Sequence, residues 1–429
     1  MVHRYHDATK HDFDRFSRSI GYLDWASQPQ PFRSFAGTGL YQLPQHSLLH
    51  RGPTPGADAP GPSSSRVSRT ERHSTPIAYD QLFDGPPVAP APVSAEAIGE
   101  LLRHSLGLSA WKQFRESRWA LRVNPSSGNL HPTEAYLVAG PVAGLAETAA
   151  VYHYAPDRHA LEERCAFDAA AWAGAVGDGS CVALVALTSI HWREAWKYGE
   201  RAFRYCQHDL GHAIAAIRFA AALVGWKAAM VPAWPQSEIA ALVGVNRDAD
   251  FANAEREEPA CVLALTADRE LPTADCRLLT ESRLLVNAAR EGRWSGRANQ
   301  LSEVHVEWPI IDEVARATAD AGHLVVGRPH PSHLSHPSHT PHPSHRSLDA
   351  RTIVLQRRSA LAFDARSSID RQAFLSMLDR TLPGPRAPWD ALWWTPRIHL
   401  ALFVHRVDGV APGLYALVRS AAAVDRLKA

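Results

Sequence analysis

The stretch RVNPSSGNLHPTEAYLV, residues 122–138, decides the fold because a rigid, turn-rich loop runs directly into an apolar strand. Pro125 fixes its own φ angle, and Pro132 ends the turn before the strand begins. Gly128 has no side chain and lets another group approach the backbone closely. The loop is therefore either a tight structural turn or a place where the backbone meets a ligand.

Polar groups in this loop are compatible with a ligand but do not require one. Ser126 and Ser127 are good N-cap residues for a short helical turn, whose first N–H groups have no partner within the turn. Those N–H groups, the two hydroxyls and the Asn129 amide would form a neutral cradle for oxygen atoms or for the edge of a ring. From the local sequence alone, a structural turn explains the loop equally well.

The overall composition indicates a soluble globular protein. The chain has 429 residues, of which 45% are apolar and 21% are charged, enough for two or three domains. A net charge of +1 gives no indication of binding to nucleic acid or to an anionic membrane. No apolar run reaches the length of a transmembrane helix, and the N-terminus lacks the apolar core of a secretory signal. We therefore expect a cytoplasmic location.

The cysteine pattern agrees with that expectation. The chain has five cysteines, scattered along the sequence and without a CxxC motif. Such a set is typical of a reducing compartment and argues against a disulfide framework or a structural zinc site. No bound metal is expected.

Two low-complexity stretches divide the chain. One is rich in Pro, Gly and Ser, and the other, PHPSHLSHPSHTPHPSHRS, repeats histidine every third residue and resembles a semi-rigid spacer. The predicted organisation is a terminal extension (1–46), a linker (47–75), a main domain (76–310), a connector with the His/Pro-rich spacer (311–348) and a partial second repeat (349–429).

The main domain is predicted to be α+β. EAYLVAG, AVYHYAP, SCVALVALTSI and EPACVLALTA read as strands, and a helix with Ser94 as its N-cap precedes them. A long helix over about residues 200–224 carries apolar residues at spacings of three and four, which indicate one buried face, and Gly225 ends it. The order of elements restarts after the spacer, where Tyr415 follows a strand as Tyr152 does in the main domain. This pattern predicts a diverged internal repeat whose second copy lacks a counterpart of the long helix.

The two predicted repeats keep complementary halves of one possible site. Arg357, Arg358 and Ser359 offer two guanidinium groups and a hydroxyl, which suit a phosphate. The first repeat has only Arg103 and His104 at the matching place, and the second has no loop like PSSGN. The alternative for the arginine pair is a solvated position at the start of a helix.

Three stretches carry a family resemblance: RVNPSSGNLHPTEAYLV, WKYGERAFRYCQHDLGHAIAAIRFAAALVGW and QRRSALAFD. Residues 80–270 resemble the nitroreductase superfamily of flavoproteins, in particular its SagB-type branch, whose members oxidise thiazolines and oxazolines in peptide natural products. The resemblance implies a nitroreductase-like α+β fold, here with one complete lobe and a partial second lobe of a tandem form.

The resemblance also implies an FMN cofactor between the two lobes. One lobe would contact the phosphate and the other would supply the Pro-Ser-Ser loop. The residues that match the family's cofactor contacts, or are expected to assist them, are Arg122, Pro125, Ser126, Ser127, Asn129, Arg201, Arg357, Arg358 and Ser359.

Lys197 and Tyr198 match the acid/base pair of the azoline-oxidising branch. A lysine must be neutral to act as a base, and burial near Arg201 or Arg204 would lower its pKa. The alternative is that Lys197 is solvated, that Tyr198 packs in the core and that the two arginines pair with carboxylates.

The resemblance implies an FMN-dependent dehydrogenase or oxidase that transfers hydride from a peptide-like or azoline substrate to FMN, in a natural-product pathway. The expected partners are a small molecule or modified peptide, and a partner enzyme or second copy of the chain. Two alternatives are an NAD(P)H-dependent nitro or quinone reductase and a non-catalytic scaffold with the flavin-binding fold. A remote alternative is a zinc hydrolase, because HDLGH places His208 and His212 at i and i+4. Against it, Asp209 is shorter than the glutamate of the HExxH motif.

Overall fold

The computed structural model describes residues 1–44, 76–84, 86–177, 181–267, 282–320, 322, 348–360, 362–394, 396–420 and 423–424. The predicted linker (47–75) and the His/Pro-rich spacer lie outside the described residues. No helix in the described part of the chain is long and apolar enough to cross a membrane.

One antiparallel sheet organises the molecule, and within the described residues it has eight strands. Its order is β11-β7-β6-β5-β8-β10-β9, and β2 pairs with the first half of β7. The four strands predicted from the sequence are its central members β5, β6, β8 and β10. The strands are β2 (Gly39–Gln42), β5 (Thr133–Ala139), β6 (Ala149–Ala155), β7 (Ala160–Phe167), β8 (Cys181–Ser189), β9 (Lys227–Met230), β10 (Glu258–Thr266) and β11 (Arg293–Trp294).

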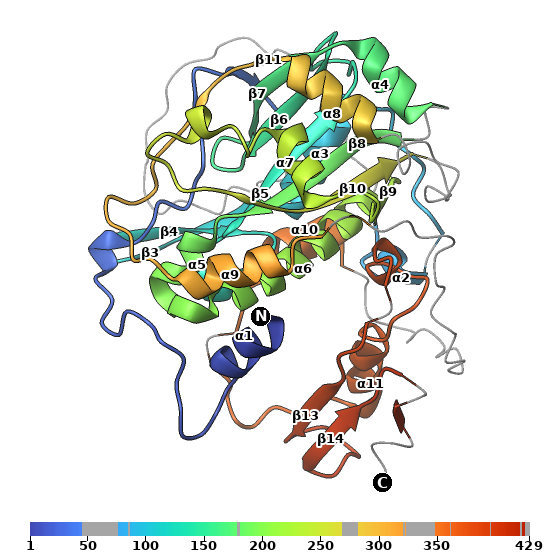
Figure 1. Ribbon diagram of the computed structural model, residues 1–429. Coiled ribbons are helices and arrows are strands. Elements are labelled where there is room, and N and C mark those ends of the chain that lie inside the picture. The colour runs from blue at the N-terminus through green and yellow to red at the C-terminus, as the bar shows by residue number, and fades with distance from the viewer. Residues whose placement is uncertain are drawn as a thin grey trace, which may run out of the picture.

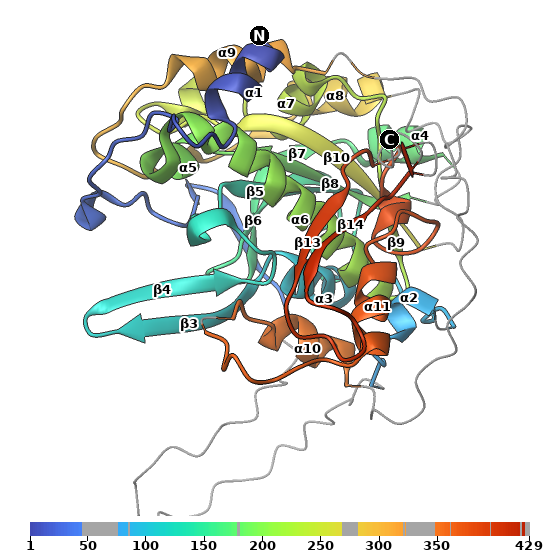
Figure 2. The ribbon, with the colours of Figure 1, turned by 90° about the horizontal axis from the view of Figure 1, so that it is seen from below.

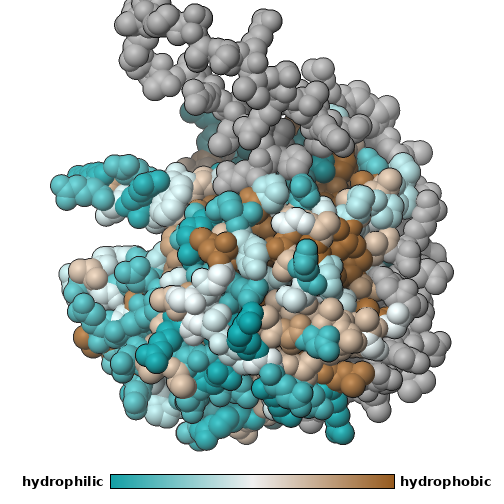
Figure 3. Space-filling view, turned by 90° about the horizontal axis from the view of Figure 1, so that it is seen from above, coloured by the Kyte–Doolittle hydropathy of each residue, from teal (hydrophilic) through white to brown (hydrophobic). Residues whose placement is uncertain are grey.

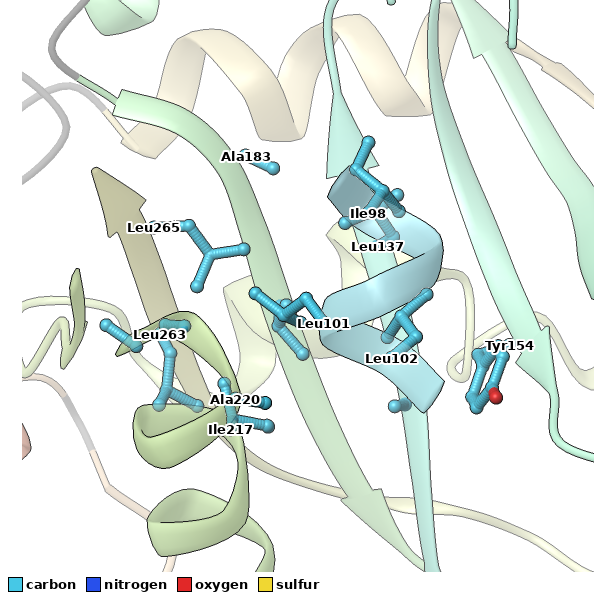
Figure 4. Close-up of a cluster of buried hydrophobic side chains, with 14 of the residues drawn as sticks. Ile98, Leu101, Leu102, Leu137, Tyr154, Ala183, Ile217, Ala220, Leu263 and Leu265 are labelled. Atoms are coloured by element: carbon cyan, nitrogen blue, oxygen red, sulfur yellow. The ribbon is translucent and has the colours of Figure 1, made fainter. Parts of the chain in front are cut away.

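Helices cover both faces of this sheet (Figure 1). The helices α3 (Ala95–Ser105) and α6 (Ala202–Leu223) lie on one face, where Ile98 and Leu101 meet Ile217 over Leu263 and neighbouring sheet side chains (Figure 4). The other face carries α4 (Ala169–Val176), α7 (Gln236–Val243) and α8 (Ser282–Glu291). Strands buried on both faces explain why their sequences are continuously apolar.

The two helices below the sheet begin and end as their sequences predict. The Ser94 side chain accepts a hydrogen bond from the backbone N–H of Ala97 and caps α3. In α6, the apolar stripe predicted from the sequence is buried from Cys206 onward, while Phe203 is only half-buried. Gly225 follows with φ +72°, and a Cβ there would lie 2.4 Å from the carbonyl oxygen of Ala89, so only glycine fits.

A buried ionic network lies in the sheet, beside the loop that precedes β5. Glu134 is 1% exposed; it accepts hydrogen bonds from Arg193 and, at 3.1 Å, from His153 Nε2, and Arg122 lies 3.7 Å away. Burial alone would raise the pKa of Glu134, but the guanidinium groups of Arg193 and Arg122 hold it well below its usual value. His153 also contacts Glu162 at 2.8 Å, so two carboxylates surround one imidazole.

We expect the substitution Glu134→Ala to lower the free energy of unfolding by about 3–5 kcal/mol, because it leaves the buried Arg193 without its partner. Urea denaturation of the two proteins measures the difference. The matched control is Glu147→Ala at an exposed position, which is expected to change stability by less than about 0.5 kcal/mol. Equal stabilities of the wild type and the Glu134 variant would contradict this account of the network.

The terminal extension packs on the main domain, a question that the sequence left open. Its helix α1 (Val2–Thr9) lies on the start of α6, where the Tyr5 hydroxyl donates to the carbonyl of Glu200 at 2.7 Å. Further on, Arg33 is fully buried and donates to Glu257 at 2.9 Å. The strand β1 (Phe35–Ala36) then pairs with β12 (Arg297–Ala298).

A two-stranded hairpin stands away from the body of the molecule. It consists of β3 (Leu108–Phe114) and β4 (Ser117–Arg122) and precedes the loop directly (Figure 2). Seen from the opposite side, it projects as a mostly hydrophilic arm (Figure 3). At its exposed end the Arg118 guanidinium lies 4.3 Å from the centre of the Trp111 ring. The sequence analysis did not predict this hairpin.

The C-terminal part is joined to the main domain by buried ion pairs. The helix α10 (Ala350–Gln356) lies beside α3, where Arg351 donates to Glu100, and Arg218 of α6 binds Asp390 at 2.7 Å. Further along, the chain forms α11 (Arg371–Asp379) and β13 (Leu400–Val404), and β13 pairs with β14 (Gly413–Leu417). In Figure 1, α11, β13 and β14 lie apart from the main sheet.

The C-terminal hairpin repeats a pairing of the main sheet. Tyr415 stands opposite Leu402 in the β13–β14 ladder, as Tyr152 stands opposite Leu137 in the β5–β6 ladder. This agrees with the predicted correspondence of the two tyrosines, and the tandem repeat itself stays a prediction. Leu414 on β14 is 70% exposed, whereas both strands of the β5–β6 pair are buried.

Candidate functional site

The loop ahead of β5 contains the short helical turn that its sequence predicts, but the Ser126 side chain at its start forms no capping hydrogen bond. The turn η2 (Ser127–Asn129) has positive φ angles at Gly128 (+61°) and Asn129 (+61°). The Ser126 hydroxyl accepts a hydrogen bond from the backbone N–H of His131 at 2.8 Å and closes the loop. Pro125 and Ser126 are half-buried, so the loop is partly open to solvent.

Most polar groups of the loop already have partners within the protein. The backbone N–H and the hydroxyl of Ser127 donate to the carboxylate of Asp209 at 2.9 and 3.0 Å. The Asn129 amide donates to the Ala120 carbonyl at 2.9 Å, and its oxygen contacts the His131 ring at 3.0 Å. The expectation that the polar groups of the loop are free to bind a ligand is therefore wrong for Ser127 and Asn129. A ligand would mainly contact the surface of the loop and would find few free hydrogen-bond donors there.

Lys197 and Tyr198 lie directly against this loop. They are the last two residues of α5 (His191–Tyr198), which packs beside η2 and α6. A Cβ atom placed on Gly128 would lie 2.6 Å from the Tyr198 hydroxyl and 3.2 Å from Lys197 Nζ. The absence of a side chain at Gly128 therefore leaves the space that these two functional groups occupy.

Aromatic rings surround the pair. Tyr198 stacks on Tyr205 of α6 with ring centres 4.4 Å apart, and burial raises the pKa of Tyr198 to about 12, so the phenol is protonated at neutral pH. Lys197 Nζ lies 5.5 Å from the ring centre of Trp25, which comes from the terminal extension and is itself 62% exposed. Trp25 belongs to η1 (Trp25–Ser27), which the hydrogen bond from the Trp196 indole to Ser27 Oγ holds on α5 at 3.0 Å.

Two buried carboxyl groups, those of Asp209 and Glu194, lie close to Lys197 and Tyr198. Neither is among the predicted site residues. Asp209 is fully buried and holds Ser127, and burial raises the pKa of Asp209. Glu194 is also fully buried, and neither of its oxygens has a hydrogen-bond partner among the residues that the structure describes. Burial, with the charge of Asp209 adding to it, raises the pKa of Glu194 to about 9. The sequence feature that could have identified Glu194 as a site residue is its spacing, because it precedes Lys197 and Tyr198 by three and four residues on one helix face.

The arginine pair lies at the start of the same loop. Immediately after α10, the Arg357 guanidinium donates to the carbonyl of Val123 at 3.3 Å, and Arg358 donates to the carbonyl of Ser109 at 3.1 Å. Ser359 is exposed beside them. Neither guanidinium forms an ion pair with any carboxylate in the described part of the chain. Segments more than two hundred residues apart in sequence thus meet at one end of the loop.

Two other predicted cofactor residues have partners elsewhere. Arg122 is 4% exposed and donates to the backbone carbonyls of Pro31 and Thr133 within the Glu134 network. Arg201 lies over the Tyr205 ring, with its guanidinium carbon 5.3 Å from the ring centre. The direct contribution of Arg122 and Arg201 to cofactor binding stays a prediction.

The zinc alternative finds no support in the geometry of HDLGH. Asp209 points into the protein and holds Ser127, while His208 and His212 are exposed. Among the described residues, no group of three or more His, Cys, Asp or Glu side chains is arranged to hold a metal ion.

Residues 88–264 match the model of the nitroreductase family. Among solved structures, a candidate nitroreductase from Anabaena variabilis is similar, with 18% identity, a TM-score of 0.61 and coverage of 97% of this chain and 77% of that chain. These likenesses confirm the predicted nitroreductase-like α+β fold, and the family match indicates an oxidoreductase.

Two more distant structures match smaller parts of the chain. The E. coli microcin synthetase McbBCD complex with truncated pro-MccB17 bound has 19% identity, coverage of 52% of this chain and 79% of that chain, and a TM-score of 0.33. A candidate nitroreductase from Ralstonia eutropha has 18% identity, coverage of 49% and 89%, and a TM-score of 0.30. Scores this low do not establish a shared fold. No curated protein sequence matches the chain.

Proposed function

We propose that this chain is an FMN-dependent dehydrogenase or oxidase of the SagB type, which removes two hydrogens from a peptide-like or azoline substrate. The observation that carries the proposal is the convergence of Lys197 Nζ and the Tyr198 hydroxyl on Gly128. A base and a hydroxyl donor side by side against a glycine suit a substrate that must lose a proton.

The residues at the loop fit the phosphate end of FMN. Arg357 and Arg358 are adjacent and exposed, and no described carboxylate neutralises either of them. Partial burial and the neighbouring positive charge of Arg357 lower the pKa of Arg358. A bound phosphate dianion would therefore reduce the repulsion between the two guanidinium groups. Ser359 adds a hydroxyl. Because the Ser127 and Asn129 side chains are already bonded within the protein, the loop would contribute its surface at Pro125 and Ser126.

Bound FMN would supply a two-electron acceptor for the hydride. The protein would handle the proton. Lys197 forms no ion pair with any described residue, and its amine would take the proton from substrate carbon. Tyr198 keeps its own proton at neutral pH and would donate a hydrogen bond to the substrate. The exposed face of Trp25 would cover the amine and restrict the access of water.

The test combines the FMN-loaded protein with a synthetic peptide that contains a thiazoline, in the absence of oxygen. The expected result is loss of the absorbance of oxidised flavin together with loss of two hydrogens from the peptide, seen by mass spectrometry. Flavin that reacts with NADPH and a quinone but with no azoline would favour the reductase alternative and contradict the proposal.

A further inference from the structure

Glu194 is a buried group of this site whose chemistry the proposed function does not use. It lies in the first turn of α5, three residues before Lys197, with no exposed surface. Within the described part of the chain, both carboxyl oxygens lack a hydrogen-bond partner. An ionised carboxylate in such a place would lose its hydration without compensation, which costs far more than keeping the proton.

Its electrostatic surroundings also favour the neutral form. The titratable groups that face Glu194 are Lys197 and Tyr198 on its own helix and Asp209 and Cys206 on α6. Burial is the main cause that raises the pKa of Glu194, the negative charge of Asp209 adds to it, and only Lys197 opposes them. One nearby cation does not overcome burial and a second carboxylate.

We propose that Glu194 is present as a neutral carboxylic acid at neutral pH and acts as a positioning residue that leaves the Lys197 amine without a carboxylate partner. An ionised Glu194 one helical turn away would stabilise the ammonium form of Lys197 and oppose its action as a base. A neutral carboxyl has no such effect. This role rests on the proposed function, whereas the protonation state of Glu194 does not.

Infrared spectroscopy tests the protonation state on the purified chain without any cofactor. The wild type at neutral pH is expected to show the carbonyl stretch of a buried protonated carboxyl group, which disappears in Glu194→Gln and remains in the matched control Glu147→Gln. The band is expected to disappear from the wild type above about pH 9. Its absence from the wild type at neutral pH would overturn the proposal.

The effect on Lys197 is measured by its reaction with acetic anhydride, quantified by mass spectrometry, because only the neutral amine reacts. At neutral pH, Lys197 is expected to react at the same rate in the wild type and in Glu194→Gln. Above about pH 9, Lys197 should react more slowly in the wild type than in the variant, because ionised Glu194 stabilises the ammonium form. A Gln variant that reacts about tenfold faster at neutral pH would show that Glu194 is ionised and paired with Lys197, which contradicts the proposal.

The stability of the same variants gives a further readout. Because the folded-state pKa of Glu194 lies above its ordinary value of 4.5, its ionisation opposes folding increasingly as pH rises toward about 9. Glutamine does not titrate. The stability difference between Glu194→Gln and the wild type, measured with urea, is expected to shift in favour of the variant over this range, and a constant difference would contradict the proposal. Should FMN fail to bind, the proposed function falls while these three results still decide the state of Glu194.

Discussion

Lys197→Met is expected to lower the rate of substrate oxidation by about 100-fold or more, the loss typical of a missing general base. Its amine and the Tyr198 hydroxyl occupy the space beside Gly128. Methionine keeps much of the length of the side chain and its contact with Trp25 but cannot accept a proton. The measurement is the rate of anaerobic flavin reduction by a thiazoline peptide.

The flavin content of this variant separates chemistry from folding. Lys197→Met is expected to bind FMN as the wild type does, since the proposed phosphate contacts are Arg357 and Arg358. The control Lys112→Met removes a lysine from the projecting hairpin and is expected to keep full activity. An unchanged rate in the Lys197 variant would rule out the assignment of this residue as the base.

Arg357→Ala is expected to weaken FMN binding by about 10- to 100-fold, because one charge-assisted hydrogen bond contributes roughly 1.5–3 kcal/mol. The same change at Arg358 should have a similar effect. The two guanidinium groups bond to backbone carbonyls of Val123 and Ser109, at the start of the loop and in β3, and not to carboxylates. Fluorescence titration with FMN measures the dissociation constants.

Riboflavin, which lacks the phosphate, provides the sharper comparison. If the arginine pair binds the phosphate, riboflavin is expected to bind the wild type weakly and to bind the Arg357 variant no worse. The control Arg366→Ala removes an exposed arginine on the same segment and should leave FMN affinity unchanged. A similar loss of affinity for FMN and riboflavin would assign Arg357 to structure and contradict the phosphate contact.

The central part of the fold was predictable because its signals are local. Helices mixed with apolar strands indicated an α+β domain, and the apolar stripe of α6, with Gly225 after it, indicated that helix and its buried face. The Ser94 cap was equally local. The β3–β4 hairpin was not predicted, since its exposed strands lack a clear alternation of apolar and polar residues and have no buried face to impose one.

Part of the candidate site was predictable from the sequence, but its buried carboxyl groups and its internal bonding were not. Lys197, Tyr198 and the arginine pair came from motif resemblance, and the structure brings all of them to the loop. That Asp209 would occupy the Ser127 donors depends on how α6 packs against η2, which no local pattern states. Glu194 looks like an ordinary charged helix residue until its burial is known, so only the tertiary structure identifies it.

The most direct test of the account is the number of FMN molecules bound by each purified chain, measured from the visible spectrum after FMN loading. One FMN per chain, reduced to less than one in Arg357→Ala/Arg358→Ala under the same conditions, is the result that a site between the arginine pair and the loop predicts. A colourless chain that takes up no FMN would contradict it.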